Sequence, residues 1–275
     1  MRPVFEILPA SLDAENCTLL CELNNEGFSC CIKDEVKNTF LGLAIYHYDK
    51  SKHPVGFPID LQIIFHQKKI LSQRFKKVKI VYSLPQSVLI PFHMYHRENT
   101  GDLMNLMHGD LCQNETLLSD VITTQSMYNC YRIPTAIYEI MQSQFPHAES
   151  MHQYSLLLKE PARLEDKLCI IFYTRKIIVS LIKDEKYQLI NSYNYHSPED
   201  VGYILLNLCR QFDIQNIRLE VSGLLEENSA LYKELYKFFT DINFKILSET
   251  TVVSEEIAKY PSHYFSYLFE IDSCE

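Results

Sequence analysis

Short apolar segments separated by turn residues occupy the first third of the chain. Residues 18–23 and 28–34 are rich in strand-forming residues, and the turn Asn24-Asn25-Glu26-Gly27 between them predicts a β-hairpin. A third strand is predicted over 39–48. Apolar residues then recur at helical spacing from 59 to 75, which predicts a helix, and a strand is predicted over 78–82. The predicted order is therefore β-β-β-α-β.

The second half of the chain repeats this order. Strands are predicted over 168–172, 176–183 and 187–195, with Thr174-Arg175 at the first turn. Ser197 followed by Pro198 and two acidic residues is a typical helix start. A strand over 217–221 follows that helix and completes a second β-β-β-α-β unit.

Short sequence matches support an internal duplication. The tetrapeptide Ile-Lys-Asp-Glu occurs at 32–35 and again at 182–185, and a Tyr-His pair ends the third predicted strand of each copy, at 46–47 and 195–196. Because these matches occur in the same order, we predict two similar halves, residues 1–150 and 151–275. The segments outside the repeat predict helices over 98–108, 135–144 and 229–239 and strands over 116–124 and 244–247.

A three-stranded meander, a helix and a fourth strand, made twice, resembles the ribonuclease-H-like core as duplicated in actin-like ATPases. The chain also resembles a bacterial family known only as a domain of unknown function, family 3822, whose members have an actin-like ATPase fold. The resemblance rests on 19–34, 87–92 and above all 189–224, where these residues follow the family's pattern: Asn191, Tyr193, Pro198-Glu199-Asp200, Tyr203-Ile204-Leu205 and Ser222-Gly223. We therefore expect an α/β protein of two ribonuclease-H-like halves with mixed sheets.

The resemblance implies a nucleotide cleft between the halves, in which each hairpin turn supplies an Asp-x-Gly phosphate loop. Such a loop needs backbone N–H groups close to phosphate and a carboxylate that positions Mg²⁺ through water. In this chain an Asn replaces the expected acid of the first turn, and the second turn has neither acid nor glycine. The candidate cleft residues are Asn24, Asn25, Gly27, Thr174, Arg175, Ser222 and Gly223.

Composition excludes several other classes of protein. Only 7 of 275 residues are glycine, which argues against a glycine-rich phosphate loop, and the net charge of −9 argues against a nucleic-acid partner. The most basic stretch, 67–79, fits a solvated helix face and strand edge. No apolar run reaches 18 residues and no secretory signal is present, so we expect a cytoplasmic protein with no membrane association.

The cysteines, histidines and acids of this sequence form no pattern that is typical of a catalytic or metal site. The nine cysteines are scattered through apolar segments, which is typical of buried, reduced thiols. His93, His96 and His108 lack a metal-ligand pattern. A ribonuclease-type nuclease needs converging acids, and the central strands offer only Glu22 in one copy and Glu220 in the other. We therefore nominate no catalytic residue and no metal.

Aromatic residues are the remaining feature with a functional interpretation. The chain has 18 tyrosines and 15 phenylalanines, which crowd the segments 232–239 and 260–269. Most are expected in the core, but tyrosine is also enriched at protein interfaces. We therefore expect a non-catalytic binding or assembly module, with a protein partner or a homo-oligomer formed through an aromatic surface, and no cofactor. The alternative is a nucleotide-binding protein or ATPase that binds Mg-ATP in the cleft through atypical contacts.

Overall fold

The computed structural model describes residues 1–48, 57–110, 114–160 and 165–273. The chain forms two compact units, each of which is described by itself. Unit 1 consists of Met1–Pro161, Thr250–Lys259 and Leu268–Glu275, and unit 2 of Ala162–Glu249 and Tyr260–Tyr267. The boundary that we predict at residues 150/151 refers to the two copies of the repeat, and it stays a prediction. No helix in the described parts of the chain is long and apolar enough to cross a membrane.

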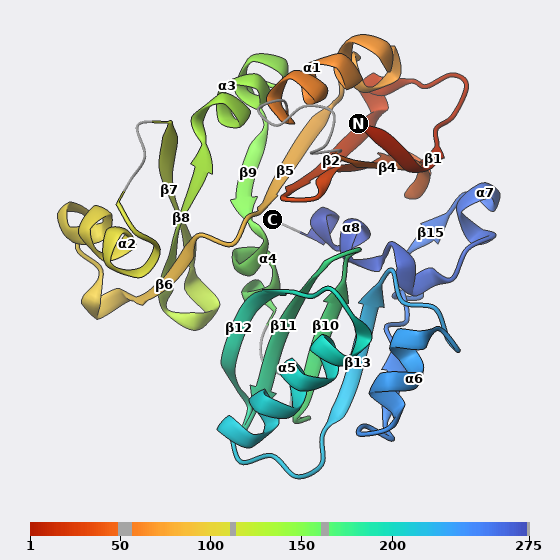
Figure 1. Cartoon of the computed structure of the whole chain (residues 1–275). Coiled ribbons are helices and arrows are strands. Elements are labelled where there is room, and N and C mark those ends of the chain that lie inside the picture. The colour runs from red at the N-terminus through yellow and green to blue at the C-terminus, as the bar shows by residue number, and fades with distance from the viewer. Residues whose placement is uncertain (49–56, 111–113, 161–164, 274–275) are drawn as a thin grey trace. The chain divides into compact units, whose positions relative to one another are not determined.

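The sheet of unit 1 is built around the predicted hairpin. Strands β2 (Cys17–Asn24), β3 (Gly27–Asp34) and β4 (Thr39–His47) form an antiparallel meander, α1 (Phe57–Gln67) follows, and β5 (Lys77–Ser83) returns parallel to β2. The sheet order is β1-β4-β3-β2-β5-β9, with β1 (Arg2–Ile7) antiparallel to β4 and β9 (Glu149–His152) parallel to β5. The short strand β15 (Val252–Val253) also pairs with β4. Figure 1 shows these elements.

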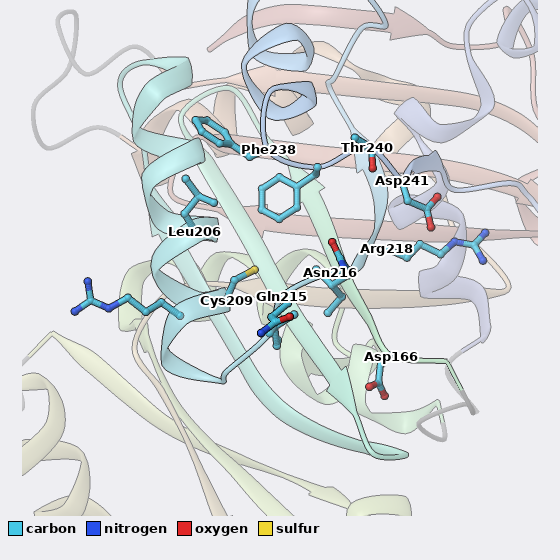
Figure 2. A pocket seen from close by; sticks show the side chains of 13 residues that line it. Asp166, Leu206, Cys209, Gln215, Asn216, Arg218, Phe238, Thr240 and Asp241 are labelled. Atoms are coloured by element: carbon cyan, nitrogen blue, oxygen red, sulfur yellow. The ribbon is translucent and has the colours of Figure 1, made fainter.

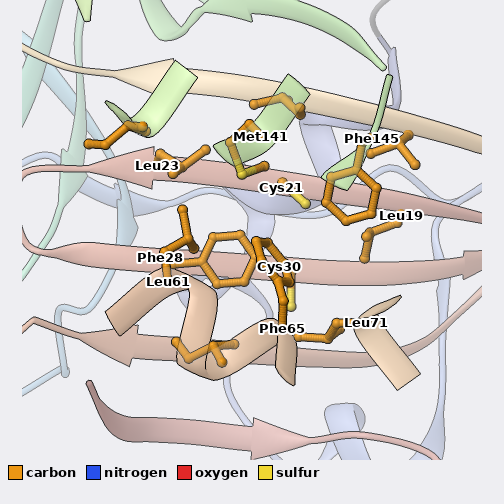
Figure 3. Packing of buried hydrophobic residues seen from close by; sticks show 14 of the residues in the cluster. Leu19, Cys21, Leu23, Phe28, Cys30, Leu61, Phe65, Leu71, Met141 and Phe145 are labelled. Atoms are coloured by element: carbon orange, nitrogen blue, oxygen red, sulfur yellow. The ribbon is translucent and has the colours of Figure 1, made fainter. Parts of the chain in front are cut away.

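Apolar side chains on one face of this sheet form the core of unit 1 (Figure 3). Phe28 on β3 contacts Phe65 on α1 edge-on, with ring centroids 5.5 Å apart, and Phe65 contacts Phe145 in the same way. The helices α1 and α3 (Thr135–Gln144) supply Leu61 and Met141, which are fully buried. The alternation of apolar residues along β2 and β3 therefore decides which face of the sheet carries the helices.

A second, smaller sheet is inserted into unit 1 after β5. It has the order β6-β8-β7, formed by β6 (Ser87–Pro91), β8 (Met127–Pro134) and β7 (Glu115–Ile122), and all pairs are antiparallel. Helix α2 (Thr100–His108) packs on it through Met104, and Ile90 and Cys130 complete its core. After β9, the short helix α4 (Gln153–Lys159) ends the first half of the chain.

Unit 2 repeats the arrangement with fewer additions. Its sheet has the order β12-β11-β10-β13-β14, formed by β10 (Lys167–Phe172), β11 (Lys176–Lys183), β12 (Lys186–Asn194), β13 (Arg218–Gly223) and β14 (Ile242–Phe244). β10, β11 and β12 are an antiparallel meander, and β13 is parallel to β10. Helix α5 (Pro198–Gln211) joins β12 to β13, and with α6 (Ala230–Tyr236) it covers one face of the sheet.

Helix α5 begins where the sequence predicts a helix start, at Ser197 and Pro198. The hydroxyl of Ser197 accepts the backbone N–H of Asp200, and the carboxylate of Asp200 accepts the backbone N–H of Ser197, so that both residues form a capping box. Pro198 occupies the first helical turn, where its missing N–H costs nothing.

The internal duplication is confirmed by the topology. In both units the meander strands, the crossover helix and the parallel return strand occur in the same order, and the repeated Ile-Lys-Asp-Glu ends the second meander strand of each. The pairing of the second and third strands is irregular near the repeated tetrapeptide in both units, between Ile32 and Lys33 in β3 and, one residue earlier in the repeat, between Leu181 and Ile182 in β11.

Several predicted elements differ from the observed ones. The helix predicted to reach residue 75 ends at Gln67, because the chain turns at Lys68 into a 3₁₀ turn that buries Leu71, and the Ser72 hydroxyl donates to the Phe65 carbonyl oxygen at 2.7 Å. Strands β1, β6, β8 and β9 were not predicted. Each is held in place by pairing with a strand that is distant in the sequence.

Glycine at the hairpin turn provides a first test of this packing. A Cβ at position 27 would lie 1.9 Å from the backbone oxygen of Tyr46 on β4, so we expect Gly27→Ala to lower the free energy of unfolding by about 2–3 kcal/mol. In the control Gly101→Ala, on α2, a Cβ would meet nothing within 4 Å, so stability should be unchanged or slightly higher. Chemical denaturation measures both, and equal effects would contradict the packing argument.

Candidate functional site

In sheets of this kind, ligands bind beyond the carboxyl ends of the parallel strands. In unit 1 the parallel strands β2, β5 and β9 end at Asn24, Ser83 and His152. In unit 2 the parallel strands β10, β13 and β14 end at Phe172, Gly223 and Phe244. The candidate cleft residues lie at these two edges, with three of them in unit 1 and four in unit 2.

Asn24 closes the first hairpin turn from within. Its side-chain oxygen Oδ1 accepts the backbone N–H groups of Glu26 at 2.7 Å and of Gly27 at 3.0 Å. An Asn side chain that bonds the backbone two and three residues later stabilises a tight turn. Because the two N–H groups already have a partner, they are not available to cradle a phosphate oxygen.

The other contacts of this turn are structural as well. Asn24 is buried, and its Nδ2 lies 3.4 Å from Oε2 of Glu22, which is fully buried on the same strand. Gly27 packs against the backbone of β4, so its lack of a side chain serves strand pairing. Asn25, at the tip of the turn, is exposed.

Gln153 is a residue at this edge that the sequence analysis missed. It follows β9 directly and begins α4, its side chain is 1 % exposed, and neither its amide oxygen nor its amide nitrogen has a hydrogen-bond partner. A buried polar group without a partner costs free energy, so this side chain is unusual. The sequence analysis could not place Gln153 at the end of a strand, because β9 has only four residues and was not predicted.

The second hairpin turn has no acid, and a buried cation begins the strand that follows it. Lys176 is 3 % exposed, and its Nζ lies 4.3 Å from the ring centroid of Tyr173, a cation–π contact. The turn is closed by a bond from the backbone N–H of Tyr173 to the carbonyl oxygen of Lys176 at 2.9 Å. Thr174 and Arg175 lie at its tip and are exposed.

The chain bends sharply at the end of β13, where the candidate residues Ser222 and Gly223 lie. Gly223 has φ +82°, and a Cβ there would lie 2.1 Å from the backbone oxygen of Phe172. The N–H groups of Leu224 and Leu225 donate to the carbonyl oxygens of Phe172 and Gly223, at 2.8 and 2.9 Å. Ser222 is buried, with its hydroxyl 3.5 Å from the Ile170 carbonyl oxygen. The glycine is thus required by strand packing.

The acid on the central strands of unit 2 has a structural partner. Glu220 on β13 pairs with Lys167 on β10, with 2.9 Å between Oε2 and Nζ. Burial raises the pKa of Glu220, but the hydrogen bond and charge of Lys167 outweigh burial and hold the pKa below its usual value. Within the described residues, no three His, Cys, Asp or Glu side chains come together as metal ligands.

The cysteines of the hairpin belong to the core. Cys17, Cys21, Cys30 and Cys31 are buried and free, and burial raises the pKa of Cys17 to about 11 and of Cys30 to about 12. These thiols therefore stay protonated at neutral pH and act as small apolar side chains.

Three lysines of the predicted basic stretch have partners in unit 1. Lys68 pairs with Glu6 at 2.5 Å and Lys77 with Glu149 at 3.0 Å. Lys79 is buried and donates to the backbone oxygen of Asp272 at 2.5 Å. Lys69, Arg74 and Lys76 are exposed, as expected of a solvated face, and the other three lysines join the stretch to the rest of unit 1.

The aromatic segments divide between core and surface. The segment 260–269 contains five tyrosine and phenylalanine residues. Four of them are buried, and the fifth, Tyr260, is 40 % exposed. On the helical side of unit 2, Tyr236 and Phe238 are about half exposed, at 54 % and 48 %, and Tyr203 on α5 is 72 % exposed. The exposed aromatic side chains of unit 2 therefore gather mainly on α5 and the end of α6.

A groove of about 520 Å³ opens beside these aromatic residues (Figure 2). Leu206 and Phe238 line one part of it, and Asp166, Arg218 and Asp241 line another, at the amino ends of the parallel strands. Cys209 also lines the groove, and burial raises the pKa of this thiol. The lining mixes both charge signs with apolar surface, which suits contact with another molecule better than catalysis.

Each unit contains one ribonuclease-H-like sheet. A chain with two such sheets has the actin-like ATPase fold, and this fold defines the class of protein. The structure is similar to a protein of actin-like ATPase fold and unknown function from Bacteroides thetaiotaomicron, with a TM-score of 0.76 and 20% identity over 97% of this chain and 100% of that one. The chain belongs to the family described as Protein of unknown function (DUF3822), whose model matches residues 10–242. The resemblance expected from the sequence is therefore confirmed.

A more distant similarity relates the fold to a protein complex. A chain of the PilM–PilN type IV pilus biogenesis complex matches with a TM-score of 0.55 and 10% identity, over 92% of this chain and 97% of that chain. No curated protein sequence matches this chain. These similarities establish the fold and leave the activity to be argued from the residues.

Replacing Asn24 by the acid that is typical of the fold tests the packing of this side chain against Glu22. Asn24→Asp should lower the free energy of unfolding by about 2 kcal/mol at neutral pH, because it places a second carboxylate beside the buried Glu22. The pair would bind a proton more readily when folded, so the loss should shrink as the pH falls. The exposed control Asn25→Asp should change stability by less than about 0.5 kcal/mol, and an equal loss in both variants would contradict this assignment.

The Lys167–Glu220 pair predicts a second pH dependence, which follows from a lowered pKa. A lowered pKa in the folded state stabilises the protein above the unfolded pKa, and this stabilisation is lost as the pH falls through the folded pKa. Glu220→Gln should therefore cost about 0.5 kcal/mol at neutral pH and nothing in acid. Glu165→Gln, which breaks the more exposed pair with Arg218, is the control and should have a smaller effect at every pH.

Proposed function

We propose that this protein is a non-catalytic binding and assembly module built on an actin-like ATPase scaffold. The observation that carries the proposal is the state of the first phosphate turn, where Asn24 occupies the backbone N–H groups of Glu26 and Gly27. A phosphate would have to compete with these two bonds, and the position of the metal-orienting acid holds a neutral amide.

The other two loops support the same proposal. The second turn has no acid, and the buried Lys176 after it lies against Tyr173, where its charge would repel Mg²⁺. The loop after β13 bonds its own N–H groups to Phe172 and Gly223. Each loop is thus stabilised by contacts inside its own unit and needs no nucleotide for its conformation.

Protein assembly is supported by the surface of unit 2 and by the fold. The exposed aromatic residues on α5 and α6 offer large apolar area with polar tips, which is typical of protein interfaces. A chain with this fold occurs in the PilM–PilN type IV pilus biogenesis complex, so the scaffold is compatible with a structural role in an assembly. We place the partner surface on these aromatic residues and the protein in the cytoplasm, where free thiols persist.

Titration calorimetry with Mg-ATP tests the proposal. We expect no saturable heat at millimolar nucleotide, and no rise in the thermal unfolding temperature. A ligand present at about 100 times its dissociation constant would stabilise the protein by about 2.7 kcal/mol, which a thermal shift readily detects. Mg-ADP and Mg²⁺ alone serve as matched titrants.

Saturable micromolar binding of Mg-ATP would overturn the proposal in favour of the nucleotide-binding alternative. Gln153→Leu would then locate the site, because this buried amide has no partner in the protein and a ligand would be its natural one. Gly223 is a poor choice for the same purpose, since any side chain there collides with the backbone of Phe172.

A further inference from the structure

The outer strand of unit 2 has an unusually open edge. Strand β12 pairs with β11 on one side, and in the described parts of the chain no strand pairs with its other side. None of its nine residues is buried, and each is either exposed or half-exposed. An edge of this length presents backbone donors and acceptors to any extended chain that can reach it.

The equivalent strand of the first copy is covered. In unit 1 the third meander strand is β4, and its outer edge pairs with β1 at residues 43–47 and with β15 at residues 39–40. Six of the nine residues of β4 are buried. The duplicated fold therefore accepts an added strand at this position, and the second copy leaves the same position open.

The direction of the backbone groups along β12 can be assigned from two hydrogen bonds. The N–H of Tyr195 donates to the Arg175 carbonyl oxygen at 3.0 Å, towards the neighbouring strand. Because backbone groups alternate along an antiparallel strand, those of Ile190, Ser192 and Asn194 point away from β11. The N–H of Ser192 accordingly donates to its own neighbour's side chain, Oδ1 of Asn191, at 2.9 Å.

The side chains of β12 lack the usual protection of an edge. Natural edge strands carry charges, prolines or bulges that prevent pairing. Here Lys186, at the first position, is the single charged residue among Lys186–Asn194, and the irregular pairing with β11 lies at the same end, near Gln188. The segment from Leu189 to Asn194 is uncharged and regular, so it is the part free to pair.

We propose that β12 pairs antiparallel with β12 of a second copy of this chain, about a two-fold axis at Asn191. In this register Leu189 lies opposite Tyr193 of the second copy, and both of these side chains pack partly against the core beneath α5. Ile190 and Ser192, whose backbone groups point outward, then lie opposite each other and exchange hydrogen bonds. Asn191 lies opposite itself, where its amide can leave Ser192 for its counterpart.

A second copy fits this edge better than a charged peptide would. The register places Leu189 opposite Tyr193 and brings no two like charges together, although the chain as a whole carries a net charge of −9. A two-fold axis is also the commonest symmetry of soluble homo-oligomers. The resulting dimer would join two five-stranded sheets into one. This surface belongs to unit 2 alone, so it goes beyond the proposed function and does not depend on nucleotide binding.

Sedimentation velocity on the full chain tests the dimer, with charge at the two-fold axis as the probe. The wild type should show a concentration-dependent dimer. Asn191→Glu and Asn191→Lys should each raise the dissociation constant at least about tenfold, because each puts two like charges directly opposite one another. An equimolar mixture of the two variants should recover association, because opposite charges then face each other.

Matched controls keep the outcome decisive. Gln62→Glu, at an exposed position on α1 of unit 1, should leave the dissociation constant unchanged. Recovery in the mixture also shows that both charged variants are folded. A wild type that stays monomeric throughout the concentration series would overturn the proposal, as would a dimer that neither Asn191 variant weakens or a mixture that fails to associate.

Discussion

Parallel pairing of the first and fourth strands is the interaction on which each unit depends. β2 pairs with β5 in unit 1 and β10 with β13 in unit 2, residue by residue over six or seven positions. This pairing brings the hairpin turn and the loop after the fourth strand to one edge, and it demands a close backbone approach. Gly223 meets this demand directly, since its backbone lies against Phe172 with no room for a side chain.

The same constraint explains the two glycines at the candidate site without any ligand. A glycine at the end of β13 and one at the first hairpin turn remain in the chain, and each is explained by strand packing. The turn that could hold phosphate is instead closed by Asn24, and the second turn by a cation stacked on Tyr173. Sheet pairing and ligand binding therefore place separable demands on these loops, and the chain satisfies the first demand.

The duplication makes differences between the two units informative. Unit 1 carries added strands, an inserted three-stranded sheet and a C-terminal segment whose Asp272 bonds Lys33 and Lys79. Unit 2 keeps the bare five-stranded sheet, with an uncovered edge at β12 and exposed aromatic residues on α5 and α6. Added strands in unit 1 cover the strand edge whose equivalent in unit 2 is open, which directs the search for partners to unit 2.

The sequence by itself determined the two meanders, the capped helix α5 and the duplication, because period-two alternation, turn residues and capping are local signals. It also determined that the phosphate turns lack their acid. Only the tertiary structure decided the rest. Strands β1, β6, β8 and β9 are held by pairing with distant segments, and the burial of Gln153 and the role of Asn24 depend on neighbours that no local pattern encodes. Hydrogen-bond partners brought from far along the chain are a property of the folded state, so the chemistry of the site emerged only there.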